Sequence, residues 1–116
     1  MKIAIGCDPN AENEKQALMK FIEDKGLGEV EDFGSTDPIY ANVAIKVGEA
    51  VASKEYDRGI LLCGTGLGVS IAANKVKGAY AALLTDAYSA ERARLSNDAN
   101  IACMGAFTTG SKEREL

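Results

Sequence analysis

The sequence contains no histidine, and this absence excludes more functions than any other feature of its composition. Without imidazole there is no Ser-His-Asp triad, no Cys-His nucleophile pair and no zinc site that depends on histidine ligands. General base chemistry is then left to Cys, Asp, Glu, Lys or Tyr side chains. Any active site in this chain must be built from those residue types.

Clusters of basic residues and long apolar runs are also absent. The formal net charge is -4 at pH 7, and no run of Lys and Arg of the kind that nucleic acid or an anionic membrane requires is present. No apolar stretch approaches the roughly 20 residues that cross a membrane, and the N-terminus shows no signal-peptide pattern. We therefore expect a soluble, cytoplasmic protein that binds neither nucleic acid nor membrane.

Cysteine is scarce as well. The three cysteines, Cys7, Cys63 and Cys103, are an odd number, and each lies at the end of a predicted strand. They do not lie in loops at paired spacings, as a disulfide framework would require. This usage suits a reducing compartment.

The length of 116 residues is enough for one domain with a single core. We predict one domain over residues 1–116. Residues 111–116, a serine followed by charged residues and one leucine, look like the first turn of a further helix, but no apolar stripe follows. We expect this domain to lack a C-terminal helix in the given chain.

The apolar pattern predicts strands alternating with helices. Strands are predicted at 2–7, 29–33, 59–62, 79–84 and 100–104, and helices at 11–25, 39–53, 69–75 and 87–95. This alternation predicts an α/β fold, a doubly wound five-stranded parallel sheet with helices on both faces, in a Rossmann-like three-layer sandwich. In such sheets ligands bind beyond the carboxyl ends of the strands. Asp8 and Cys63, which follow or end two of the strands, are therefore expected to line one crevice.

The most informative stretch joins the central strand to its helix through Cys63, Gly64, Gly66 and Gly68. A strand that runs through a glycine-rich turn into a helix leaves backbone N–H groups unpaired, and these can hold an anion. A cysteine in this position can ionise near neutral pH and act as a base or nucleophile. A buried cysteine is equally common as a small apolar residue, so the thiol alone does not decide between the two interpretations.

Two anion-binding chemistries are disfavoured by the spacing of this turn. It lacks the Gly-Lys-Ser/Thr ending of a nucleotide-binding P-loop. Val69 stands where a cysteine phosphatase would carry its arginine, six residues after the thiol. A phosphocysteine carrier stays open, since amides around a thiolate would also hold a phosphoryl group.

Four motifs together resemble the type B ribose-5-phosphate isomerase and galactose-6-phosphate isomerase family. They are Gly-Cys-Asp at 6–8, the segment 59–75, Tyr-Ser-Ala at 88–90 and Asn-Asp-Ala-Asn at 97–100. The resemblance covers nearly the whole chain in order. It implies aldose–ketose isomerisation of a phosphorylated sugar without a metal or cofactor. It also implies a homodimer or dimer of dimers whose active site uses both protomers.

The resemblance assigns roles to individual residues. Cys63 matches the family's base, which moves a proton between neighbouring carbons through a cis-enediolate, and Thr65 would supply a hydroxyl to the base or the enediol. The residues that match substrate-binding positions, including the amides of an anion hole, are Asp8, Tyr40, Gly64, Gly66, Leu67, Gly68 and Asn97. From the residues alone, Asp8 and Asn97 fit caps or turns equally well, and Tyr40 fits the first turn of a surface helix.

Three departures from the family pattern concern the substrate. Pro9 and Ser96 stand where histidines are usual, and Phe107 stands where an arginine usually contacts phosphate. The histidine replaced by Ser96 is credited with opening the sugar ring. A four-carbon aldose phosphorylated on O4 cannot close a five-membered ring, so it needs no ring opener. Ser96 therefore favours a tetrulose 4-phosphate over ribose and ribulose 5-phosphate, whereas Phe107 fits neither substrate well.

The same departures allow a second interpretation. The chain would then be a non-catalytic or partner-dependent subunit of a heteromeric sugar-phosphate isomerase, as in galactose-6-phosphate isomerase, which uses two chains. With Phe107 in place of the usual arginine, the cation that holds the phosphate is not assigned. Arg92 and Arg94 are candidates in the sequence, and a C-terminal segment beyond the given chain is the other.

Overall fold

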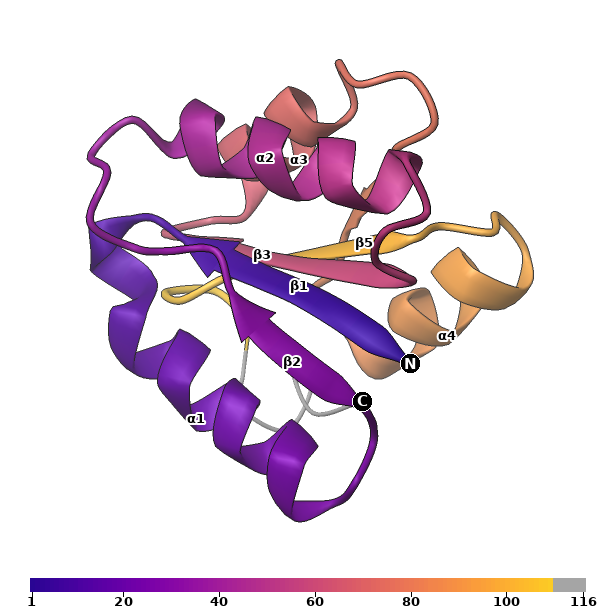
Figure 1. Ribbon diagram of the computed structural model, residues 1–116, viewed down its shortest axis with the longest axis horizontal. Helices are drawn as coiled ribbons and strands as arrows, with labels where there is room; N and C mark the ends of the chain where they lie inside the picture. Colours follow the sequence, from indigo (N-terminus) through magenta and orange to yellow (C-terminus); the bar gives the residue numbers. More distant parts are fainter. Residues whose placement is uncertain (110–116) are drawn as a thin grey trace.

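A five-stranded parallel sheet lies between two layers of helices (Figure 1). The computed structural model describes residues 1–109, and the helix start expected at 111–116 lies outside them. The strands are β1 (Lys2–Cys7), β2 (Glu29–Asp32), β3 (Arg58–Cys63), β4 (Ala81–Leu83) and β5 (Ile101–Gly105). The helices are α1 (Glu12–Asp24), α2 (Tyr40–Ala52), α3 (Leu67–Ala73) and α4 (Ala87–Leu95), with a 3-10 turn, η1 (Pro9–Ala11), before α1. The predicted α/β fold is confirmed.

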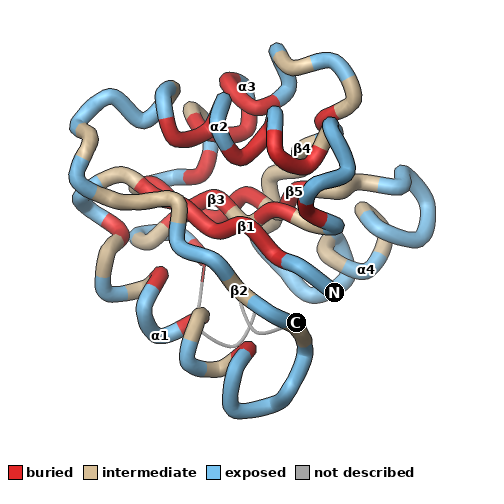
Figure 2. Tube along the Cα trace, viewed as in Figure 1, coloured by how far each residue is buried: buried red, intermediate tan, exposed pale blue. Residues whose placement is uncertain are grey.

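The central strands are buried on both faces, which explains their unbroken apolar sequences. Leu61 and Cys63 pack toward α2 and α3, and the intervening Leu62 packs toward α1. Figure 2 shows that burial is concentrated in β1, β3 and the inner sides of α2 and α3. In contrast, α4 contributes no buried residue. Within residues 1–109, no helix is both long and apolar enough to cross a membrane.

The strand order β2-β1-β3-β5-β4 brings the carboxyl ends of β1 and β3 together. From β1 the chain passes through α1 to β2 on one side, and then through α2 to β3 on the other side. The ends of β1 and β3 are therefore the point where the direction of winding reverses, which is where ligands of such sheets bind. Cys7 pairs with Leu62, so the next residues, Asp8 and Cys63, lie side by side at this edge.

The helix after the glycine turn begins and ends two residues earlier than predicted, at Leu67 and Ala73. Its start is set by Gly66, whose left-handed backbone turns the chain directly into the helix. Its end is set by Asn74, whose side chain accepts from Ala81 N (2.8 Å) and donates to Ala81 O (2.9 Å). These two bonds hold the start of the short strand β4, which follows seven residues later.

Candidate active site

The glycine turn between β3 and α3 depends on Gly66. Its φ of +81° lies in the left-handed region, where a side chain is strained. A Cβ atom there would lie 2.7 Å from Leu83 Cδ1 and 2.8 Å from the carbonyl carbon of Met104. Only glycine therefore fits between the turn and the neighbouring strands β4 and β5.

The sulfur of Cys63 lies against this turn. The Gly66 amide donates to Cys63 Sγ at 3.1 Å, and the Leu67 amide donates to Thr65 Oγ1 at 3.2 Å. Among the described residues 1–109, the amides of Gly64, Thr65 and Gly68 have no protein acceptor. The turn therefore combines a thiol, a hydroxyl and several donors that remain available to an anionic oxygen.

Cys63 is well covered in the single chain, since only 6 % of its surface is exposed and it belongs to the apolar cluster under α2 and α3. The interpretation of Cys63 as a small apolar core residue therefore describes how its side chain is packed. The hydrogen bond from Gly66 and the unpaired neighbouring amides distinguish it from Cys7 and Cys103, for which burial raises the pKa of the thiol. Those two thiols stay protonated, because the apolar surroundings disfavour the charged form.

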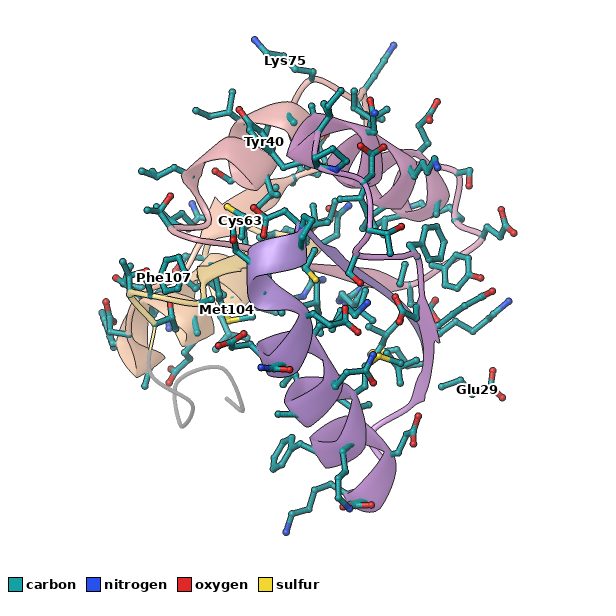
Figure 3. The ribbon with its side chains drawn as sticks, turned by 90° about the vertical axis from the view of Figure 1, so that its left-hand side faces the viewer. Glu29, Tyr40, Cys63, Lys75, Met104 and Phe107 are labelled. Carbon is teal, nitrogen blue, oxygen red and sulfur yellow. The ribbon has the colours of Figure 1, made fainter. Side chains whose placement is uncertain are left out.

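Two aromatic rings flank the turn. A Cβ on Gly68 would lie 2.6 Å from the Tyr40 ring, and one on Gly64 would lie 3.2 Å from the Phe107 ring. Figure 3 shows Cys63 between Tyr40, at the start of α2, and Phe107, after β5. Phe107 is held there by hydrogen bonding of its amide to Gly64 O at 3.0 Å. The side chains are 43 % and 74 % exposed, respectively, so the rim of the site is aromatic at both positions.

Asp8 lies at the end of β1, beside β3. Its amide donates to Leu62 O at 3.2 Å, and its carboxylate accepts from the Asn10 amide at 3.1 Å. The carboxylate thus caps the 3-10 turn η1, as the alternative interpretation of this residue expected. The half-buried side chain also stands at the edge where Cys63 lies, so the capping and substrate-binding roles are compatible.

Asn97 is not brought to Cys63 within one chain. It follows α4 and precedes β5, whose first residue, Ile101, pairs with Gly59. Gly59 and Cys63 lie at opposite ends of β3, about 13 Å apart at 3.3 Å per residue. In Figure 1, α4 lies near the N-terminus of β1, at the amino edge of the sheet. Asn97 can therefore bind substrate at Cys63, as the sequence predicts, only if it reaches the site from a partner subunit.

The arginines of α4 are engaged at that same amino edge. Arg92 donates to Ser96 Oγ through Nε (2.9 Å) and through its terminal nitrogen (2.6 Å). Arg94 forms an ion pair with Asp98 at 2.6 Å. Neither arginine is placed beside Cys63 of its own chain.

Sequence reasoning missed Lys15, which is buried in the first turns of α1 and paired with two carboxylates. The sequence contains one sign of this burial, because Lys15 is a charged residue on the apolar stripe that continues with Leu18 and Ile22. Among residues 1–109, no cluster of three or more metal-ligating side chains is found.

A thiol and unpaired amides at the carboxyl edge of a doubly wound parallel sheet are features of an α/β protein with a ligand site that can hold an anion. Comparison with known proteins identifies the family. The model of the Ribose/Galactose Isomerase family matches residues 3–115. The chain therefore belongs to this family of sugar-phosphate isomerases, as the sequence motifs indicated.

Individual relatives agree with this assignment. The chain is 50% identical to Ribose-5-P isomerase B of Listeria innocua, over 95% of this chain and 76% of that protein. It is 47% identical to D-erythrulose-4-phosphate isomerase 2 of Mycolicibacterium smegmatis, with the same coverage of each chain. Among solved structures, Ribose-5-Phosphate Isomerase B of Clostridium thermocellum matches with a TM-score of 0.90 and 47% identity, over 97% of this chain and 77% of that one. The chain thus spans about three quarters of the length of these relatives.

Proposed function

We propose that the protein interconverts the aldose and ketose forms of a small sugar phosphate, with Cys63 as the base. The observation that carries the proposal is that the Cys63 sulfur lies against a turn in which the Gly64, Thr65 and Gly68 amides have no acceptor within residues 1–109. Relatives named as isomerases of ribose 5-phosphate and of erythrulose 4-phosphate support this reaction class.

In the proposed reaction the Cys63 thiolate removes the proton on C2 of the aldose. The electrons of that C–H bond form the C1–C2 double bond, and the carbonyl electrons move onto O1, which gives a cis-enediolate. The sulfur then returns the proton to C1, while the proton of the O2 hydroxyl passes to O1 and the ketone forms at C2. No atom is gained or lost, so no cofactor takes part in the balance.

The turn stabilises the charge that develops in this sequence. The amides of Gly64, Thr65 and Gly68 would donate to the enediolate oxygens, and each such donor is typically worth about 2.7–4 kcal/mol of the barrier. Thr65 Oγ1 already accepts from the Leu67 amide, which leaves its proton for a substrate oxygen. The Gly66 amide donates to Cys63 Sγ and so fixes the position of the sulfur against the turn.

A four-carbon substrate fits the residues of this chain best. Ser96 supplies no imidazole for ring opening, and an aldotetrose 4-phosphate is already open. A further relative, 39% identical, is named 4-deoxy-4-sulfo-D-erythrose isomerase and is also named for a four-carbon sugar. Phe107 offers an aromatic surface and no cation beside Gly64, and this does not separate the two substrates, since both carry a phosphate group.

Turnover of a substrate panel tests this function. We expect kcat/KM for erythrose and erythrulose 4-phosphate to exceed that for ribose and ribulose 5-phosphate by about tenfold, since a mismatched substrate group typically loses 1–3 kcal/mol. Coupled assays with four-, five- and six-carbon phosphates measure this, with the Cys63→Ala protein as the blank. Equal or greater turnover of the pentose phosphates would overturn the four-carbon assignment.

Two other results, one from the substrate panel and one from mass spectrometry, would identify the alternative functions. A purified protein that turns over no substrate, but gains activity when a related chain is added, would be a partner-dependent subunit. A mass increase of one phosphoryl group on Cys63 after incubation with a phosphate donor would identify a phosphocysteine carrier.

We further propose that the protein acts in the cytoplasm as a homodimer that shares its active sites, or as a dimer of such dimers. The free thiols of Cys7, Cys63 and Cys103 support a reducing compartment. Exposed apolar side chains on and before α2 and α3 support an interface; they are Ile39, Tyr40, Ile45, Leu67 and Ile71. A partner subunit can also bring Asn97 to the Cys63 edge, which the chain's own Asn97 does not reach.

Mixing two inactive variants tests the shared site. We expect Cys63→Ser and Asn97→Ala proteins to be inactive alone and to recover about a quarter of the wild-type activity after joint refolding, because half of a two-fold symmetric dimer population is mixed and one of its two sites is intact. The rate of isomerisation measures this recovery. If Asn97 served the site of its own chain, no mixed dimer would contain an intact site, and no activity would return.

A further inference from the structure

Lys15 occupies a position where an apolar residue is expected. On α1 the buried residues are Lys15, Leu18 and Ile22, which share one face of the helix and point toward the sheet. Only 1 % of the Lys15 side chain is exposed, yet it carries a charge. A lysine is almost never this deeply buried unless it is paired.

The Lys15 ammonium is held by two carboxylates from different elements. Its Nζ lies 2.8 Å from Asp32 Oδ1, at the end of β2, and 3.0 Å from Glu12 Oε2, in α1. Burial alone would lower the pKa of Lys15, but the hydrogen bond to Asp32 and the ion pair with Glu12 outweigh it and the pKa is raised. The adjacent Cys7 thiol has a pKa raised to about 12 by burial, so it is neutral and adds no charge. The lysine is therefore permanently protonated.

A chain of hydrogen bonds runs from Lys15 to the Cys63 edge. Asp32 Oδ1 accepts from the Gly34 amide at 2.8 Å as well as from Lys15. Gly34 O in turn accepts from the Cys7 amide at 3.1 Å. Cys7 directly precedes Asp8, so the ammonium connects the ends of β1 and β2 to the residue that faces the site.

Glu12, the second carboxylate paired with Lys15, lies near the loop before α2. Ser35 in that loop and the Lys15 ammonium lower the pKa of Glu12 to about 2, so its carboxylate is ionised. Ser35 lies in the loop that leads to Tyr40, whose ring packs against Gly68. The Lys15 cluster thus holds both chain segments that approach the glycine turn from the β1 and β2 side.

We propose that Lys15 is a positioning residue that orients Asp8 and the 33–39 loop for substrate binding; the inference rests on the proposed function. Packing alone does not account for the lysine, since exchanging a buried ion pair for apolar residues is often neutral or stabilising. What an apolar side chain cannot do is hold Asp32 in the rotamer that receives the Gly34 amide. Asp8 and the loop contact substrate in this proposal, and Lys15 acts only through them.

The test compares Lys15→Met, which keeps the length and removes the charge, with Leu18→Ala one turn further along the same face. Both variants lose stability, the second through a cavity. We expect Lys15→Met to raise KM for the preferred sugar phosphate about tenfold with kcat changed far less, because misplaced binding groups weaken substrate binding. Leu18→Ala should leave KM within a factor of about two, since an apolar side chain takes no part in the hydrogen bonds that run from Lys15 through Asp32 to Gly34.

Amide hydrogen exchange supplies a readout that does not depend on activity. In Lys15→Met the Gly34 and Cys7 amides should exchange at least about tenfold faster relative to the rest of the sheet, and in Leu18→Ala they should not. If Lys15→Met does not fold, Asp32→Asn takes its place in both measurements. Unchanged exchange at these amides, or a KM no higher than that of Leu18→Ala, overturns the proposal. An inactive wild-type protein would refute the proposed function alone, while exchange would still decide whether Lys15 holds the loop.

Discussion

Replacing Cys63 with serine or alanine is expected to lower kcat for aldose–ketose interconversion about 10²- to 10⁴-fold, the usual contribution of a positioned general base. Serine retains the shape of the side chain but its hydroxyl does not ionise near neutral pH, so neither variant can remove the proton from carbon. The Gly66 amide, which donates to the sulfur at 3.1 Å, would then have no thiolate to stabilise. Steady-state rates in both directions measure the loss.

A matched control is available because Cys103 is a second buried thiol on β5, beside β3. Burial raises the pKa of Cys103, so this thiol carries no charge in the mechanism. Cys103→Ala should cost stability by opening a small cavity and leave kcat within a factor of about three. Incorporation of solvent deuterium at C1 or C2 provides a second readout, and it should disappear with Cys63 only. Undiminished turnover and deuterium incorporation in Cys63→Ala would remove the thiol from the mechanism.

Most of the fold was accessible from the sequence because central parallel strands have a distinctive composition. Residues 3–7 and 59–63 are buried or nearly so on both faces of the sheet, so their apolar runs carry no alternation and differ clearly from the helices. The predicted helix at 87–95 has the observed bounds of α4, and in the structure Asp86 caps its start by accepting from the Ser89 amide. The start of α3 was missed because Gly66 is fixed by contacts with Leu83 and Met104, which are distant in the sequence.

The candidate site was accessible only in part, for reasons of topology and burial. Asp8 and Cys63 could be paired because carboxyl ends of neighbouring parallel strands meet at one edge. The same rule puts Asn97 at the other edge, since the helix before it starts from the carboxyl end of β4. Lys15 was not predicted, because a lone lysine in an amphipathic helix is normally solvent-exposed and its partner Asp32 is a distant residue on β2.

Substituting alanine for Gly66 is the second change with a large expected effect. A residue with a side chain at φ +81° is strained by about 1–2 kcal/mol relative to glycine. The added Cβ would also lie 2.8 Å from the carbonyl carbon of Met104, and a backbone contact cannot be relieved by rotating a side chain. Overpacking of this kind typically costs a further 1–3 kcal/mol or so. We therefore expect a total loss of about 2–5 kcal/mol in the free energy of unfolding, measured by denaturant titration.

Gly26→Ala separates the strain of the backbone from the effect on the site. Gly26 also has a positive φ, +62°, but no atom lies within 4 Å of the place its Cβ would take. This variant should lose only about 1–2 kcal/mol and keep its full activity. In Gly66→Ala the turn must shift, and the amide that donates to Cys63 Sγ moves with it, so kcat should fall about 10²- to 10³-fold, as when one oxyanion donor is removed. If the two variants, both assayed where they remain folded, showed equal kcat, the geometry of the glycine turn would have no part in the chemistry.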